Sequence, residues 1–124
     1  MVAAVIERGG RILITQRKQG GRHALKWEFP GGKIEPGEDP RDALRRELRE
    51  ELAIEADIGD LIDSHEVRYE DGPVIRLRFY RVTVFRGEPR NLEFEQIAWA
   101  EPACLPDFDF LEGDVGFVRK LSTL

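Results

Sequence analysis

Three glutamates that lie close together in the sequence, Glu47, Glu50 and Glu51, have side chains well suited to chemistry. On a helix, at about 100° per residue, their carboxylates fall within an arc of roughly 100° beside an apolar stripe. Carboxylates crowded near an apolar surface repel one another and are costly to remove from water as bare anions. A hard divalent cation removes both penalties, and oxygen ligands without a nearby His or Cys favour Mg²⁺ or Mn²⁺. The alternative is an acidic helix edge that simply faces water.

A helix over residues 40–52 is expected to position these glutamates. Asp39 is a suitable N-cap, and Pro40 suits the first helical turn. Apolar residues recur at helical spacing, at Ala43, Leu44, Leu48 and Leu52. The pattern therefore predicts a helix with an apolar face beside the carboxylates.

The segment before this helix carries two glycines followed by a lysine. Gly31 and Gly32 are expected in a loop, where free backbone groups are able to meet phosphate or metal. Lys33 follows at once and supplies a point charge suited to phosphate oxygens. Phosphate and cation binding are thus predicted side by side.

The stretch from Gly31 to Ile54 resembles the box of the Nudix hydrolases, which reads G-x5-E-x7-R-E-U-x-E-E-x-G-U with U apolar. Eight of the nine fixed positions match, over 23 residues: Gly32, Glu38, Arg46, Glu47, Leu48, Glu50, Glu51 and Ile54. Ala53 stands where the pattern has glycine. Because that glycine normally helps the chain to leave the helix, we expect the alanine to extend the helix slightly.

The resemblance reaches beyond the box, since Ile12 to Arg17 and the run from Trp27 to Lys33 are similar to the MutT branch of the family. That branch includes oxidised-dGTP diphosphatases and CTP pyrophosphohydrolases. The resemblance implies an α+β fold, an α/β/α sandwich in which helices flank a mixed β-sheet. It also implies hydrolysis of a nucleoside triphosphate to the monophosphate and pyrophosphate.

The resemblance further implies which residues form the site. The Gly31 carbonyl would hold the metal together with four carboxylates, those of Glu47, Glu50, Glu51 and Glu93, with Glu95 as the alternative to Glu93. Arg46 is placed to fix a helix carboxylate. Glu47 and Glu93 are the two candidates for the base that takes a proton from water. Lys33 would bind phosphate, and the base pocket would be lined by Arg17, Phe29, Phe79 and Asp114.

Asp114 is a departure within that pocket, because the oxidised-guanine enzymes of the branch have asparagine there. An ionised carboxylate only accepts hydrogen bonds, which suits the exocyclic amine of cytosine and also the N–H groups of 8-oxoguanine. We expect hydrolysis of oxidised nucleotides such as 8-oxo-dGTP, with CTP, dCTP or 5-methyl-dCTP as the alternative. A third alternative is a non-catalytic nucleotide-binding module, but the complete set of carboxylates argues against it.

The remaining pattern predicts the elements of a single domain over residues 1–124. Strands are expected at 2–7, 11–17, 26–29, 61–69, 74–85 and 94–100, with a turn at Asp71-Gly72. A short amphipathic helix is expected at 113–121. No role is assigned to His65, which has no metal ligand near it in the sequence.

Net charge sets the remaining constraint. The 124 residues carry 24 acidic and 19 basic side chains, a formal charge of -5, which argues against binding a nucleic-acid polymer. No apolar run is long enough for a membrane span, and the single Cys104 suits a reducing compartment. We expect a cytoplasmic monomer or homodimer. A polyanionic substrate would then require a bound cation.

Overall fold

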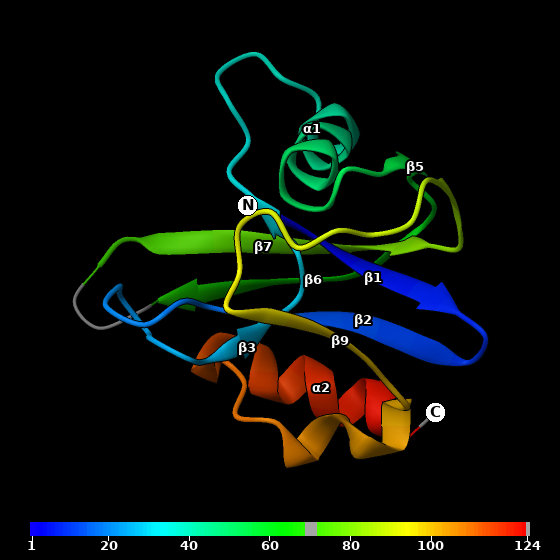
Figure 1. Ribbon diagram of the computed structural model, residues 1–124. Coiled ribbons are helices and arrows are strands. Elements are labelled where there is room, and N and C mark those ends of the chain that lie inside the picture. The colour runs from blue at the N-terminus through cyan, green and yellow to red at the C-terminus, as the bar shows by residue number, and fades with distance from the viewer. Residues whose placement is uncertain (69–71, 124) are drawn as a thin grey trace.

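The computed structural model describes residues 1–68 and 72–123, and places a mixed β-sheet between two helical layers (Figure 1). The main sheet has the strand order β3-β2-β1-β7-β6, with β4 pairing with β1 and β9 pairing with β2. β1 and β7 are parallel, and the other pairs in this sheet are antiparallel. These strands are β1 (Val2–Arg8), β2 (Arg11–Gln16), β3 (Trp27–Glu28), β4 (Gly31–Gly32), β6 (Leu61–Arg68), β7 (Val74–Val82) and β9 (Gln96–Ala100). The expected α/β/α sandwich is confirmed.

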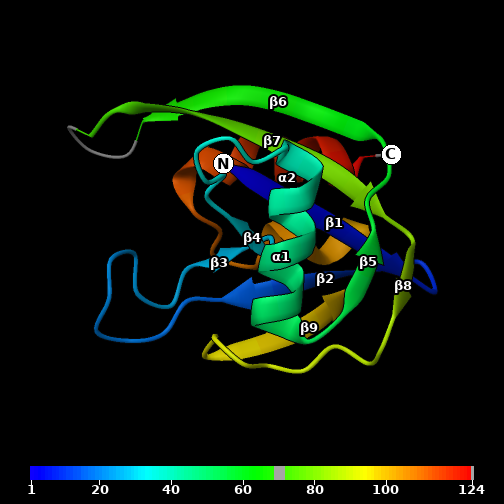
Figure 2. The same ribbon diagram turned by 90° about the horizontal axis from the view of Figure 1, so that it is seen from above.

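Helix α1 (Pro40–Leu52) covers one face of the sheet (Figures 1 and 2). The Asp39 side chain accepts a hydrogen bond from the Arg41 amide at 3.0 Å, and Pro40 occupies the first turn, as predicted. The apolar stripe is fully buried against the sheet; its members are Ala43, Leu44, Leu48 and Leu52. Burial of this stripe fixes the rotation of α1, and with it the face on which the glutamates lie.

The helix ends at Leu52, so the expected extension through Ala53 is wrong. Ala53 adopts a left-handed conformation, with φ 58° and ψ 34°, and its amide donates to the Arg49 carbonyl. Alanine thus takes the backbone shape that glycine normally provides at this position. The cause is tertiary: Ile54 and Ala56, directly after the turn, are buried in the core.

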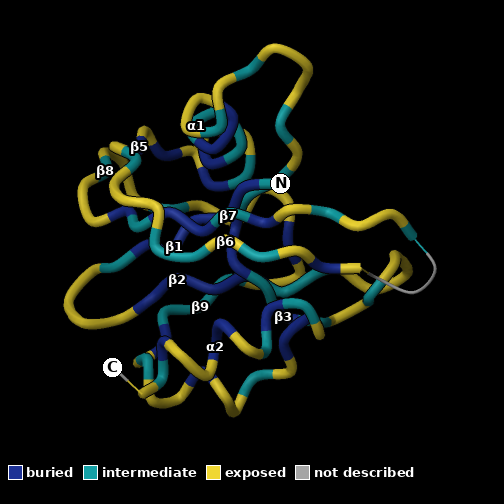
Figure 3. Tube along the Cα trace, turned by 180° about the vertical axis from the view of Figure 1, so that it is seen from behind, coloured by how far each residue is buried: buried dark blue, intermediate teal, exposed yellow. Residues whose placement is uncertain are grey.

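The opposite face of the sheet is covered by the C-terminal part of the chain. It comprises the 3₁₀ helices η1 (Pro102–Asp107) and η2 (Glu112–Asp114) and the helix α2 (Val115–Ser122). Hydrophobic residues pack in two clusters, one on each face of the sheet, and Figure 3 shows the buried strands between more exposed outer segments. The predicted closing helix is confirmed, with a 3₁₀ turn in place of its first residues.

Several predicted strands have different bounds in the structure. The strand expected over 74–85 ends at Val82, and β8 (Val84–Arg86) pairs instead with β5 (Glu55–Asp57) in a separate two-stranded sheet. The strand expected from Phe94 starts at Gln96, because the backbone of Phe94 is bonded to the side chain of Asn91. Of the predicted turn, Asp71 lies outside the described residues, as does Tyr69 of the strand expected before it.

Candidate active site

The acidic edge of α1 faces the short strand β4. The carboxylate of Glu47 packs directly against Gly32, where any side chain would collide with it. Glu51 Oε1 accepts a hydrogen bond from the Gly31 amide at 3.2 Å. The Glu47 side chain is 16% exposed, whereas that of Glu50 is 57% exposed. The structure therefore brings two of the helix carboxylates onto the glycine strand and leaves the third toward solvent.

Arg46 holds the carboxylate of Glu47 in place. Its Nη1 donates to Glu47 Oε1 at 2.9 Å, and its Nε and Nη2 each donate to the carboxylate of Glu38 at 3.0 Å. Nη2 also donates to the Lys33 carbonyl at 3.0 Å. The guanidinium lowers the pKa of Glu38, which is therefore ionised at neutral pH. One arginine thus ties α1 to the segment that follows β4.

Burial, together with the neighbouring carboxylates of Glu47, Glu28 and Glu93, raises the pKa of Glu51 to about 8, although its bond to the Gly31 amide acts in the opposite direction. Burial also raises the pKa of Glu47, although its bond to Arg46 acts in the opposite direction. Glu51, Glu28 and Glu93 line one cavity of about 310 Å³, and Glu95 is not among its lining residues. Clustered carboxylates of this kind are poorly stable as anions without a compensating cation.

The carboxylates form a cluster but not a finished coordination sphere. Across residues 1–68 and 72–123, no group of three acidic, histidine or cysteine side chains is arranged to hold a metal ion as it stands. The physical reason is that Glu47 is engaged by Arg46 and Glu51 by the Gly31 amide. The donor set nevertheless fits a hard divalent cation, since it offers only oxygen ligands, and the partly buried carboxylates of Glu47 and Glu51 repel each other.

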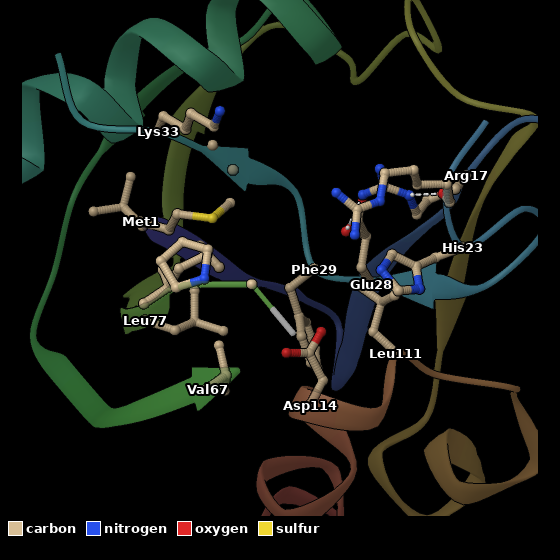
Figure 4. Close-up of a pocket in the computed structure, with 18 residues that line it drawn as sticks. Met1, Arg17, His23, Glu28, Phe29, Lys33, Val67, Leu77, Leu111 and Asp114 are labelled. Atoms are coloured by element: carbon tan, nitrogen blue, oxygen red, sulfur yellow. Dashed lines mark hydrogen bonds and ion pairs between the residues drawn. The ribbon is translucent and has the colours of Figure 1, made fainter. Parts of the chain in front are cut away.

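A second cavity, of about 320 Å³, is bordered by β4. Figure 4 shows Asp114 and Phe29 pointing into it, with Arg17 and Lys33 at its rim. Gly31 and Gly32 line it as well, so the same strand borders this cavity and contacts the helix carboxylates. The structure thus gathers four of the five predicted substrate-binding residues: Arg17, Phe29, Lys33 and Asp114.

Asp114 is the most unusual side chain in this cavity. The residue is only 3% exposed, and its Oδ1 has no hydrogen-bond partner within the described part of the chain. Burial, and to a smaller extent the charge of Glu28, raise the pKa of Asp114 to about 7, whereas His65 acts in the opposite direction. A buried acceptor without a partner is costly, and it is the kind of group that a ligand satisfies.

Phe79 does not line the cavity, so the expectation that it offers a free stacking face is not supported. It is 0% exposed, and its ring is stacked against His65 on one side and Phe117 on the other, with centroids 5.7 and 4.0 Å away. Its ring also meets that of Phe29 edge to face at 5.7 Å. The alternation of residues along the strand correctly predicts that the Phe79 side chain points inward. Other core side chains pack around its ring, so no face is left for a ligand.

Glu28 is a site residue that sequence reasoning missed. It lines both cavities and accepts hydrogen bonds from Arg17 Nη1 at 3.2 and 3.4 Å. Burial raises its pKa, while Arg17 opposes that shift. Its position within the WEFPGGK run was the available signal, but only the fold shows that it links the two cavities.

The chain matches the family model described as the NUDIX domain over residues 1–121. It is 40% identical to the CTP pyrophosphohydrolase of Escherichia coli, covering 100% of this chain and 91% of that protein. It is 38% identical to the putative 8-oxo-dGTP diphosphatase 2 of Mycobacterium tuberculosis, with 98% and 86% covered. Among solved structures, the MutT NUDIX hydrolase from Burkholderia pseudomallei superposes with a TM-score of 0.84 at 28% identity, covering 98% of this chain and 93% of that one.

These similarities agree with the box along α1, the carboxylates that it places against a glycine strand, and the sandwich that supports them. No helix in the described part of the chain has the length and apolar character needed to cross a bilayer. Nudix hydrolases act on nucleotide substrates and generally require a divalent metal. This chain belongs to the NUDIX family and is a Nudix hydrolase.

Proposed function

We propose that this enzyme is a Mg²⁺-dependent nucleoside triphosphate pyrophosphohydrolase that converts nucleotides such as 8-oxo-dGTP to the monophosphate and pyrophosphate. The observation that carries the proposal is that β4 adjoins both the cavity that holds Asp114 and the carboxylates of α1. Its two glycines border the cavity that holds Asp114 and also contact the carboxylates of Glu47 and Glu51. A nucleotide with its base at Asp114 would therefore place its phosphates along Gly31 and Gly32, near the acidic cluster.

The residues that would hold Mg²⁺ are the Gly31 carbonyl and the carboxylates of Glu47, Glu50, Glu51 and Glu93; Mn²⁺ has similar ligand preferences. When bound, the cation would neutralise phosphate charge and lower the pKa of a water ligand. Arg46 orients Glu47 through a 2.9 Å hydrogen bond. Lys33 lies at the rim of the cavity, where its ammonium group would bind the substrate phosphates. Glu47 and Glu93 remain the two candidates for the proton acceptor.

Base recognition would fall to Asp114, Phe29 and Arg17. Phe29 presents a ring in the cavity wall, and Arg17 is held there by Glu28. The unpartnered Asp114 oxygen would accept from the N–H groups of 8-oxoguanine. The 8-oxo-dGTP diphosphatase name of the mycobacterial relative supports this assignment.

A second candidate substrate class is CTP, dCTP or 5-methyl-dCTP. The specific observation is again the acceptor at Asp114, which suits the exocyclic amine of cytosine. The relative at 40% identity is named a CTP pyrophosphohydrolase.

Replacement of the acceptor by an amide, Asp114→Asn, should shift the preference among CTP, 5-methyl-dCTP and 8-oxo-dGTP while the metal requirement stays the same. Equal losses for all three nucleotides would show that Asp114 is structural.

Pyrophosphate release from a panel of nucleotides, with and without Mg²⁺, tests the proposed reaction. Glu51→Gln and Glu50→Gln should each lower kcat by several orders of magnitude with the fold intact by circular dichroism, since each removes a charge that holds the cation. Glu55→Gln is the matched control, because Glu55 pairs with Arg49 outside the cluster. Near wild-type turnover in the Glu51 and Glu50 variants would instead favour a binding module.

Free nucleotides as substrates are consistent with the net charge of -5, which disfavours a nucleic-acid polymer as partner. We propose that the enzyme acts in the cytoplasm on the nucleotide pool, as a monomer or homodimer. Size-exclusion chromatography with light scattering tests the assembly state.

A further inference from the structure

His65, on β6, stands just outside the cavity that holds Asp114 and has oxygen atoms at both ring nitrogens. Nδ1 is 2.8 Å from Asp63 Oδ2, and Nε2 is 3.0 Å from the Gly113 carbonyl oxygen. A carbonyl only accepts, and so does the Asp63 carboxylate, which also faces Lys120 of α2 at 3.5 Å. A neutral imidazole has one N–H, so both hydrogen bonds form only when the ring carries two protons.

This ring is joined to the base cavity in two ways. Gly113, whose carbonyl it binds, directly precedes Asp114 in η2. The ring also stacks on Phe79 with an interplanar angle of 25°, and Phe79 supports Phe29 in the cavity wall. His65 thus packs, through Phe79, behind the part of the cavity wall that Phe29 forms.

Two charged groups act on Asp114 in opposite senses. Glu28, from β3, favours the neutral carboxyl, whereas His65, from β6, favours the carboxylate. On β7, His65 is paired in register with Leu77 and stacks on the ring of Phe79, both of which are uncharged. Among the described residues, the charged groups near His65 are Asp63 on its own strand, Asp114 in η2 and, through Asp63, Lys120 in α2; Arg76 and Arg78 lie on β7 at the positions paired with Glu66 and Ser64.

We propose that His65 is a positioning residue for base selection: as an imidazolium between Asp63 and the Gly113 carbonyl, it fixes Asp114 in the cavity and favours its acceptor-only carboxylate. This proposal rests on the proposed function, because it assigns how the base is chosen. A carboxylate accepts from bases that present N–H groups, such as cytosine and 8-oxoguanine. A neutral carboxyl also donates, so loss of the imidazolium would favour bases that present an acceptor there.

The first experiment uses no nucleotide. The side-chain carboxyl ¹³C resonance of Asp114 is followed against pH in the full-length wild type and in His65→Gln, whose amide still donates to Gly113 but carries no charge. The midpoint should rise by roughly 0.5 to 1 pH unit in the variant, as expected for loss of one nearby positive charge. An unchanged midpoint would overturn the proposal.

Asp63→Asn provides the second variant, should His65→Gln fail to fold. It keeps the imidazole and removes the carboxylate that holds its second proton, so the Asp114 midpoint should move in the same direction. Glu66→Gln is the matched control: it removes a charge from the next position of β6, where Glu66 forms an exposed ion pair with Arg76. The Asp114 midpoint should not move in the control.

The second experiment measures kcat and KM for CTP and 8-oxo-dGTP at pH 6 and pH 8. In His65→Gln, kcat should stay within about twofold, while KM should rise several-fold and by different factors for the two bases, because the carboxylates of α1 are untouched. Equal changes in kcat for both nucleotides would indicate a merely structural role and overturn the proposal. If the wild type hydrolyses no nucleotide, the proposed function fails, and the NMR titration still decides the coupling of His65 to Asp114.

Discussion

At the scale of single residues, the site is built from carboxyl groups that burial makes hard to ionise. Asp114 and Glu51 both have a raised pKa, and in each case burial is the main cause. Asp114 lines the cavity that Gly31 and Gly32 also border, and Glu51 accepts a hydrogen bond from the Gly31 amide. Such groups lower the stability of the free enzyme and become favourable once a ligand satisfies them.

The pH dependence of folding should report this directly for Asp114. Below about pH 4 its carboxyl is protonated in the folded and unfolded chain alike. As pH rises toward 7 the unfolded chain loses this proton first, so the free energy of unfolding falls, by an amount on the order of a few kcal/mol for such a shift. Asp114→Asn should remove this part of the slope and be more stable than the wild type at pH 8. Urea unfolding from pH 4 to 8 measures it, and parallel profiles would contradict the assignment.

At the scale of elements, α1 both packs against the sheet and positions the glutamates. Its buried apolar stripe sets the rotation of the helix, and this rotation decides where the carboxylates lie. The helix must then stop so that Ile54 and Ala56 return to the core, and Ala53 makes that turn in a left-handed conformation. A non-glycine residue in this region is strained by about 1 kcal/mol. The glycine that the Nudix box has at this position therefore serves to adopt the left-handed backbone conformation. In this chain Ala53 adopts the same conformation.

Ala53→Gly should stabilise the protein by about 0.5 to 1 kcal/mol, because glycine relieves the strain at an exposed position where little packing is lost. Ala53→Val should destabilise it, since a β-branched side chain tolerates this backbone shape poorly. Thermal unfolding of the two variants against the wild type provides the measurement. A lower Tm for the glycine variant would contradict the strain argument.

The contact between β4 and α1 gives a second prediction at this scale. In Gly32→Ala the new methyl group would collide with the Glu47 carboxylate, a flexible side-chain end that is able to move. We expect a folded protein with kcat reduced at least about tenfold, since small displacements of catalytic groups have large effects. Gly116→Ala, in α2 with open space around it, is the control and should keep its activity. Wild-type kcat in Gly32→Ala would show that Glu47 need not lie where the structure places it.

Gly31→Ala should behave differently, because the nearest atoms are backbone atoms of Val2 and Ala3 in β1. Backbone of a central strand cannot move aside, and the positive φ of 158° lies near the extended region, so steric overlap is the main cause. Loss of folded protein in this variant, against a folded Gly32→Ala, would separate the structural glycine from the functional one.

At the scale of the whole molecule, the two hydrophobic clusters lie on opposite faces of one sheet. Leu48 of α1 and Leu105 of η1 are both 0% exposed, one in each cluster. Leu48→Ala and Leu105→Ala should each lower the free energy of unfolding by about 2 to 5 kcal/mol. Because they lie in different clusters, their effects should add within about 0.5 kcal/mol.

One cooperative transition in all of these variants would support the single domain expected over residues 1–124. Separate transitions for the two leucine variants, followed by both fluorescence and circular dichroism, would contradict the single domain.

The net charge of -5 is also a property of the whole molecule. Part of it comes from the carboxylates clustered around Glu51, so a bound cation would change the sign of the local field that a triphosphate meets.

The helix α1, its N-cap, its apolar stripe and the arc of Glu47, Glu50 and Glu51 were predictable from the amino-acid sequence, because helical periodicity and capping are local properties of neighbouring residues. The succession of strands and helices along the chain followed from the same local patterns, and the mixed sheet between helices followed from the family resemblance, whereas the order of the strands within the sheet came from the structure. The spatial neighbours of these residues could not be predicted from the sequence, since they depend on contacts between segments that are distant along the chain. Tertiary packing alone covered both faces of Phe79, brought Glu28 between the two cavities, and bent Ala53 into a left-handed turn. It also set His65 against Gly113, 48 positions away, where the chain passes behind Asp114.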